Sequence, residues 1–147
     1  MTFQPLPAIN EGNAAFWGAG ANGALQINRC RDCRTWYHPP APVCPECVSI
    51  NVGAEPGDGR AVLAAYTVNH QPWAPEMEVP FVLAIVELVE QAPVRLMTRM
   101  VDCEPDDVHI GMPLIVHFQQ VEDDVWLPLF RPVESMSRPV DDLEDAA

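Results

Sequence analysis

The chain has 147 residues, which is enough for one main hydrophobic core with a much smaller unit beside it. Its net charge of −13 should repel phosphate backbones, so a role in nucleic-acid binding is disfavoured. The sequence shows neither a signal peptide nor an apolar run of the roughly 18 residues that a membrane helix needs, and we expect a cytoplasmic protein that does not associate with membranes.

The N-terminal part is predicted to form one short helix. Prolines interrupt residues 1–8, which are expected to be extended. Asn10 is a candidate N-cap for a helix of about two or three turns that ends near Gly18 to Gly23. Phe16 and Trp17 are its apolar anchors. We assign residues 1–24 to an N-terminal helical segment.

Two C-x-x-C pairs follow this segment. Residues 25–30 alternate between apolar and polar side chains, as a half-buried strand does, and lead into the first pair. The spacing C-x2-C-x10-C-x2-C supplies four soft thiolates that can meet at the corners of a tetrahedron. It predicts one structural zinc ion, in a closed shell without a position for water, bound by Cys30, Cys33, Cys44 and Cys47. We assign residues 25–56 to a zinc ribbon.

The alternatives for these cysteines are two redox pairs or thiols that merely pack, and His38 is a conceivable substitute ligand. The doubled motif favours zinc, and with four cysteines available His38 is interpreted as a bystander. Such knuckles often carry glycine after the second cysteine of each pair, because the backbone turns tightly there. This chain has Arg34 and Val48 instead, so we expect weaker metal binding than usual.

The second half of the chain is predicted to be a small closed or partly closed β-barrel. A polar, glycine-rich link at 48–60, which contains the turn signal Asp58-Gly59, leads into it. Within the barrel, 104–112 is the one short helical turn expected. Turn-rich segments separate five strand-like runs, at 61–70, 79–90, 94–102, 112–122 and 125–132. We assign residues 57–132 to this barrel and 133–147 to an acidic tail that is mobile unless a partner holds it.

No catalytic constellation is visible in the sequence. The remaining histidines are scattered, and we interpret them as solvated or locally hydrogen-bonded. Cys103 has no basic surroundings, and the neighbouring Asp102 and Glu104 are expected to raise its pKa, so we treat it as inert. The acidic pairs are contiguous in sequence and should diverge on an extended chain.

The order of several short landmarks resembles the domain-of-unknown-function 35 family. These landmarks are Phe-Trp at 16–17, the double C-x-x-C motif, Val-Pro-Phe at 79–81 and Ile-Gly-Met-Pro at 110–113, and the resemblance extends from about Phe16 to Pro132. It implies a mainly β fold, with a short N-terminal helix and a rubredoxin-like zinc ribbon followed by a five-stranded OB-fold barrel.

The resemblance also implies a function. Members of this family are commonly companions of thiolase-like and lipid-transfer-protein-type enzymes that act on acyl-CoA. We therefore expect a non-catalytic accessory subunit that stabilises such an enzyme and supports its acyl-CoA channel, in a heterotetramer of two plus two chains. The expected reaction is the aldolase cleavage of a β-hydroxyacyl-CoA, for example a steroid side-chain degradation intermediate.

Three aromatic residues, Tyr66, Trp73 and Phe81, are predicted to contact the partner or acyl-CoA. Large aromatic residues in a small barrel are usually core, but Trp73 lies in the Pro-rich loop QPWAPEMEVP, where burial within its own chain is harder. One alternative function is a stand-alone OB-fold and zinc-ribbon module that binds acyl-CoA or single-stranded nucleic acid. Another is an independent enzyme acting on CoA thioesters, although the sequence offers no acid–base pair for it.

Overall fold

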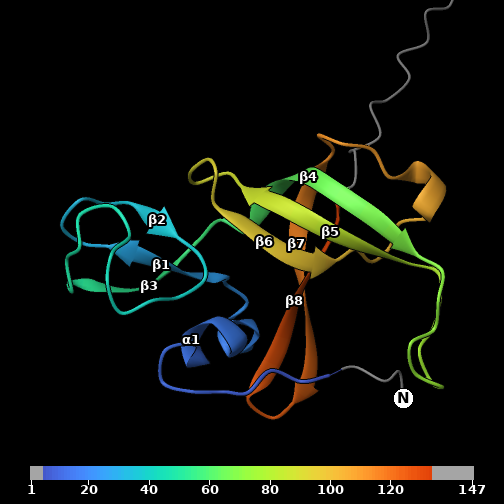
Figure 1. Cartoon of the computed structure of the whole chain (residues 1–147), viewed down its shortest axis with the longest axis horizontal. Helices are drawn as coiled ribbons and strands as arrows, with labels where there is room; N and C mark the ends of the chain where they lie inside the picture. Colours follow the sequence, from blue (N-terminus) through green and yellow to red (C-terminus); the bar gives the residue numbers. More distant parts are fainter. Residues whose placement is uncertain (1–4, 134–147) are drawn as a thin grey trace, which may run out of the picture.

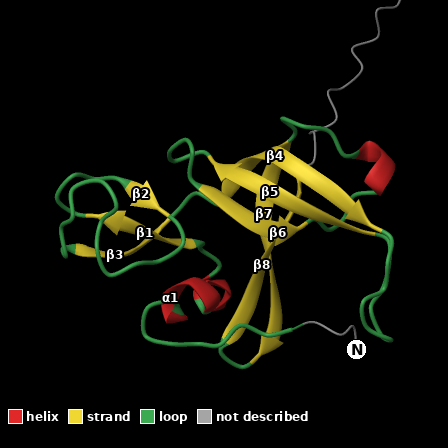
Figure 2. Ribbon diagram, in the orientation of Figure 1, coloured by secondary structure: helices red, strands yellow, loops and turns green. Residues whose placement is uncertain are grey.

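The computed structural model describes residues 5–133 of the chain, which form a three-stranded ribbon beside a five-stranded barrel (Figure 1). The one short α-helix, α1 (Ala14–Trp17), lies near the junction of the two sheets. The mainly β fold predicted from the sequence is thus confirmed, as the preponderance of strands shows (Figure 2). The acidic tail predicted for 133–147 lies outside the described residues, except for Val133. No helix in the described part is long and apolar enough to span a membrane.

The N-terminal helix is shorter than the sequence predicted. It has a single α-helical turn, Ala14–Trp17, followed by the 3-10 helix η1 (Ala19–Asn22), which ends at Gly23 with a φ of 68°. The N-cap position belongs to Asn13 and not to Asn10. The side-chain oxygen of Asn10 instead accepts hydrogen bonds from two backbone amides in the turn that precedes the helix. Glycines in this stretch favour short turns over a continuous helix because they lose the most conformational freedom in a helix.

The ribbon is an antiparallel sheet in the order β2-β1-β3. Its strands are β1 (Gln26–Cys30), β2 (Trp36–Tyr37) and β3 (Val52–Pro56). The sequence predicted a polar link where β3 lies, and this was wrong. Every residue of β3 pairs with β1, from Val52 opposite Cys30 to Pro56 opposite Gln26. An edge strand tolerates Gly and Pro because only one of its sides needs a ladder of hydrogen bonds.

The five strand-like runs predicted after residue 60 all form strands. The sheet order is β6-β5-β4-β7-β8, and all of these pairings are antiparallel. The short 3-10 helix η2 (Pro105–Asp107) connects the third and fourth of these strands. The strands are β4 (Arg60–Asn69), β5 (Phe81–Leu88), β6 (Arg95–Arg99), β7 (Pro113–Glu122) and β8 (Val125–Pro132).

A parallel contact between the ends of β6 and β8 closes the sheet into a barrel. Met100 forms a parallel bridge with Phe130, and the Val101 amide donates to the Phe130 carbonyl at 2.9 Å. Beside them the buried Thr98 hydroxyl donates to the Pro128 carbonyl at 2.7 Å. Closure removes the two open sheet edges, which is the arrangement of the predicted OB-fold.

One hydrophobic core joins the barrel, the ribbon and the N-terminal segment. Alternate residues of β5 face inward, as the period of two requires, and are buried at Val82, Ala84, Val86 and Leu88. Phe16 of α1 and Leu25 and Ile27 at the start of the ribbon belong to the same buried cluster. The ribbon is therefore packed on the barrel rather than attached to it only by a linker.

The turn between β5 and β6 also binds the ribbon through polar contacts. The side-chain amide of Gln91 accepts a hydrogen bond from the Trp36 backbone amide at 3.1 Å and donates to the Trp36 carbonyl at 3.4 Å. The neighbouring Glu90 carboxylate accepts a hydrogen bond from the backbone amide of Asp58, in the link between the units. Gln91 thus acts as a substitute strand partner for the edge of β2.

His38 is half-buried at the junction between the ribbon and α1. Its ring lies 4.9 Å from the ring of Phe16, centre to centre, and its Nδ1 atom is buried without a hydrogen-bond partner among the described residues. Burial lowers the pKa of His38 to about 4, because an apolar surrounding disfavours the charged imidazolium.

We predict that replacing Gly20 by Ala loosens the N-terminal segment. An added Cβ atom would lie 2.5 Å from the Trp126 side chain, and overpacking of this kind costs about 1–3 kcal/mol. Urea unfolding should show a lower midpoint for Gly20→Ala, whereas the exposed control Ala21→Ser should unfold like the wild type. An unchanged midpoint for Gly20→Ala would contradict the packing of η1 on β8.

We predict that His38 makes the protein less stable as the pH falls from about 6.5 to about 4. Between these pH values His38 takes up a proton in the unfolded chain but stays neutral in the folded chain. The contribution of His38 to the free energy of unfolding is therefore complete above about pH 6.5 and is lost as the pH falls to about 4. The contribution is on the order of 3 kcal/mol. Unfolding measured at several pH values should therefore be less pH-dependent for His38→Gln than for the wild type. Equal pH dependence in the two proteins would show that His38 is not the titrating group.

Candidate functional site

The four cysteines of the ribbon form one cluster. Their sulfur atoms all lie within 4.8 Å of one another, and the distances from Cys30 to Cys47 and from Cys33 to Cys44 are 3.6 Å each. Four sulfurs placed about 2.3 Å from a tetrahedral zinc ion are separated by about 3.8 Å, so the spacing fits this ion. None of these cysteines is in a disulfide.

The backbone around the cluster explains why knuckles of this kind favour glycine. Arg34 and Val48, which follow the second cysteine of each pair, have φ values of 67° and 62°. This left-handed conformation lets the chain turn back on itself, and backbone amides approach the sulfurs of Cys30 and Cys44 at 3.5 and 3.4 Å. It is unfavourable for side chains with a Cβ atom, above all for the β-branched Val48. The expected weaker metal binding stays a prediction.

The thiols of the cluster have unequal proton affinities. Hydrogen bonds between Cys33 and the side chain and backbone of Thr35 lower the pKa of Cys33 to about 6. For Cys47, a hydrogen bond from the Ser49 backbone favours the thiolate, but desolvation and the neighbouring thiols outweigh it and raise the pKa to about 12. Four crowded thiolates repel one another, so their joint deprotonation requires a cation between them.

The two other sulfur and imidazole candidates lie apart from the cluster. His38 is not among the clustered ligands, in agreement with its interpretation as a bystander. Burial raises the pKa of the Cys103 thiol, and the charges of Asp107 and Glu104 add to this effect. The sequence had assigned part of this effect to Asp102, whereas the 3-10 helix η2 brings Asp107 close instead. Cys103 is thus poorly suited to act as a nucleophile.

A second feature is the apolar outer face of the barrel, formed by side chains of β4, β5 and β6. Tyr66, Leu83 and Met97 are 40%, 37% and 77% exposed. Together with Ala65 and Ile85 they line a shallow, almost wholly apolar depression. Strand pairing brings the outward-facing members together, since Ile85 lies opposite both Ala65 and Met97. Tyr66 lies opposite the buried Ala84 and lines the depression from the next position of β4. We call these five residues the outer barrel face.

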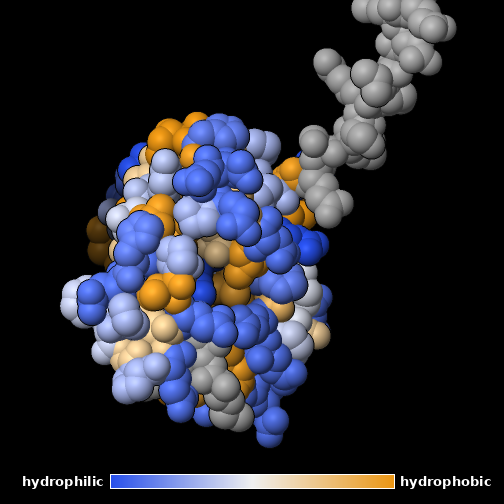
Figure 3. All heavy atoms as spheres, turned by 90° about the vertical axis from the view of Figure 1, so that its right-hand side faces the viewer, coloured by the Kyte–Doolittle hydropathy of each residue, from blue (hydrophilic) through white to orange (hydrophobic). Residues whose placement is uncertain are grey.

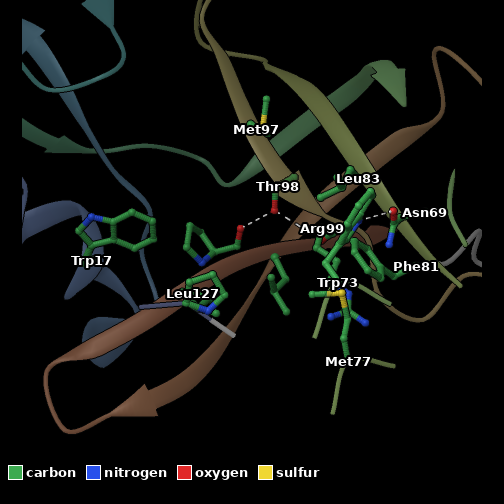
Figure 4. A pocket seen from close by; sticks show the side chains of 13 residues that line it. Trp17, Asn69, Trp73, Met77, Phe81, Leu83, Met97, Thr98, Arg99 and Leu127 are labelled. Carbon is green, nitrogen blue, oxygen red and sulfur yellow. Dashed lines mark hydrogen bonds between the residues drawn. The ribbon is translucent and has the colours of Figure 1, made fainter. Parts of the chain in front are cut away.

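A groove continues from the outer barrel face toward the loop between β4 and β5. Trp73, Met77 and Phe81 line it on the loop side, and Leu83 and Met97 are common to the groove and the outer barrel face. Trp73 is 76% exposed, and its indole nitrogen donates to the side-chain oxygen of Asn69 at 3.0 Å. Side chains from the loop and from several strands converge here (Figure 4).

The three residues predicted from the sequence as contacts therefore lie on one connected surface. Trp73 and Phe81 line the groove, and Tyr66 lines the adjoining depression. Met97 and Arg99, which also line the groove, were not predicted from the sequence. The signal for them is the alternation along β6, which leaves these two positions on the outside. Apolar patches among polar residues are also visible on the end of the molecule shown in Figure 3.

Comparison with known proteins matches both parts of the chain to models of one family. Residues 17–49 match the rubredoxin-like zinc ribbon domain of ChsH2, and residues 55–119 match the C-terminal OB-fold domain of ChsH2. A solved structure named Ltp2-ChsH2(DUF35) aldolase contains a similar chain, with 39% sequence identity and a TM-score of 0.77. The match covers 86% of this chain and 98% of that one.

Two curated relatives are similar in sequence. A probable enoyl-CoA hydratase alpha subunit from Thermomonospora curvata is 40% identical over 129 residues, which are 88% of this chain but only 40% of that protein. A DUF35 domain-containing scaffold protein from Methanocaldococcus jannaschii is 37% identical over 115 residues, which are 73% of this chain and 80% of that protein. The chain therefore belongs to the DUF35 family, as a member with a ChsH2-type zinc ribbon and OB-fold domain.

Proposed function

We propose that the chain is a non-catalytic accessory subunit that binds and stabilises a thiolase-like enzyme of the Ltp2 type. The observation that carries this proposal is the connected apolar surface of the outer barrel face and the groove. Contiguous exposed apolar surface on a small soluble domain is typical of an interaction site, and aromatic residues and Met are enriched in such interfaces. The solved relative, whose name includes Ltp2, supports the choice of partner.

The proposed reaction of the complex is the aldolase cleavage of a β-hydroxyacyl-CoA, such as an intermediate of steroid side-chain degradation. The name of the solved relative supports the aldolase, and the family resemblance supports the substrate class. In this proposal the partner supplies the catalytic groups, while this chain supports the acyl-CoA channel within a complex of two plus two chains. Tyr66, Trp73 and Phe81 are its proposed contacts with the partner or with acyl-CoA.

We further propose that the four clustered cysteines bind one structural zinc ion. The donor set is all thiolate, which suits zinc, and its spacing fits a tetrahedral ion. When bound, zinc would cross-link the two knuckles of the ribbon without offering a position for substrate. Among residues 5–133 this is the only group of three or more potential ligands close enough to bind a metal ion. The ion would thus stabilise the fold rather than take part in the reaction.

We expect Cys44→Ser to lose most of its zinc and to unfold at a lower temperature. Cys44 is buried within the cluster, and a structural zinc ion contributes its binding free energy to folding. Metal analysis of the purified proteins should find about one zinc per chain in the wild type and in the control Cys103→Ser. A wild-type chain that contains no zinc and is insensitive to a chelator would overturn this assignment.

Co-expression with the host's Ltp2-type enzyme tests the proposed function. We expect a stoichiometric complex on size-exclusion chromatography, in which the enzyme is more soluble and more active than it is alone. A chain that fails to bind this enzyme would contradict the proposal. If the isolated chain then bound acyl-CoA, this result would favour the stand-alone binding module. If it converted acyl-CoA to a product by itself, the result would favour the independent enzyme.

We predict that Met97→Glu weakens this complex by about a hundredfold or more, because it places a charge in the centre of an apolar interface. Trp73→Ala should also cost about 2 kcal/mol or more of binding free energy if the ring is an anchor. The matched control is Val89→Glu, which introduces the same charge at an exposed position outside the outer barrel face. Affinities can be measured by calorimetry, and equal affinity of Met97→Glu and Val89→Glu would exclude this face as the interface.

A further inference from the structure

Arg99 brings a positive charge into the otherwise mainly apolar groove. It lies at the end of β6, directly opposite Leu83, and both residues line the groove. The central carbon of its guanidinium group lies 4.6 Å from the centre of the Phe81 ring. Figure 4 shows it among Phe81, Met77 and Trp73. A stacked guanidinium group is held in place by the ring while the donors at its edge stay available for hydrogen bonds.

Most other arginines of the described chain already have a partner. Arg31 donates to the Val52 carbonyl at 3.3 Å. Within residues 5–133, Arg99 has no carboxylate within the 4.0 Å of an ion pair, although the chain as a whole carries a net charge of −13. Ion pairs with carboxylates at 3.0–3.7 Å involve Arg29, Arg60, Arg95 and Arg131.

The surroundings of Arg99 determine what kind of group it can receive. An anion that enters the groove would be partly shielded from water by Trp73, Met77 and Leu83, and ion pairs are stronger in such places than on an open surface. The rest of an occupant must be apolar to match the lining. The complementary structure is thus a carboxylate that has apolar groups on either side.

We propose that the groove receives an acidic side chain of the thiolase-like partner, flanked by apolar residues, and that Arg99 forms an ion pair with it. This inference rests on the proposed function. Leu83 and Met97 line both the groove and the outer barrel face, so an occupant of the groove is continuous with a protein seated on that face. This continuity favours a protein side chain over a separate small ligand, and the charge of Arg99 calls for an acidic one.

The test measures the affinity of the wild type and three variants for the host's Ltp2-type enzyme at low and at high salt. Arg99→Met should bind about tenfold more weakly than the wild type at low salt and should lose much of the salt dependence. Arg99→Lys keeps the charge and should fall between these two proteins. The control Arg95→Met, which removes a charge from the same strand outside the groove, should bind like the wild type.

Each outcome of this test bears on the inference. If Arg99→Met binds as tightly as the wild type, with the same salt dependence, the ion pair is excluded while the proposed function stands. If the wild type itself does not bind, the proposed function fails and the inference fails with it.

Free coenzyme A is a further probe, added to the isolated chain. Binding that disappears in Arg99→Met would assign the arginine to a phosphate group and overturn the acidic side chain.

Discussion

The parallel contact between β6 and β8 is the constraint on which the barrel depends. It joins the two edge strands of the sheet and sets which side chains of β6 face the interior. The buried Thr98 hydroxyl donates a hydrogen bond to β8 at the point of closure. Because neighbouring side chains of a strand point to opposite faces, holding Thr98 inward holds Met97 and Arg99 outward. The interior contact and the candidate docking surface are thus two sides of the same strand.

The ribbon and the barrel have different roles but are mechanically connected. The cysteine cluster organises the knuckles, while the apolar surface that we propose as an interface lies on the barrel. The turn between β5 and β6 links them, since Gln91 pairs with the backbone of β2 and Glu90 with the link that precedes β4. This turn also joins the two strands that carry Leu83 and Met97, so ordering of the ribbon supports the geometry of the docking surface.

The sequence was most informative where a pattern has a single structural solution. The doubled cysteine motif identified the four clustered thiols, and alternating apolar residues located all five barrel strands. It failed where tertiary pairing decides the local structure: β3 has weak strand propensity and exists because β1 offers it a ladder of hydrogen bonds. Arg99 was missed for a related reason, because its position over Phe81 depends on the pairing of two strands.

The order of the strands along the chain has a consequence for synthesis on the ribosome. All four cysteines and the three ribbon strands lie before Gly57, so the ribbon can fold first. The barrel cannot close before β8, its last strand, has left the exit tunnel, because β8 provides the partner for the free edge of β6. An unpaired strand edge is a template for aggregation. The nascent chain is therefore most vulnerable between the emergence of β6 and that of β8.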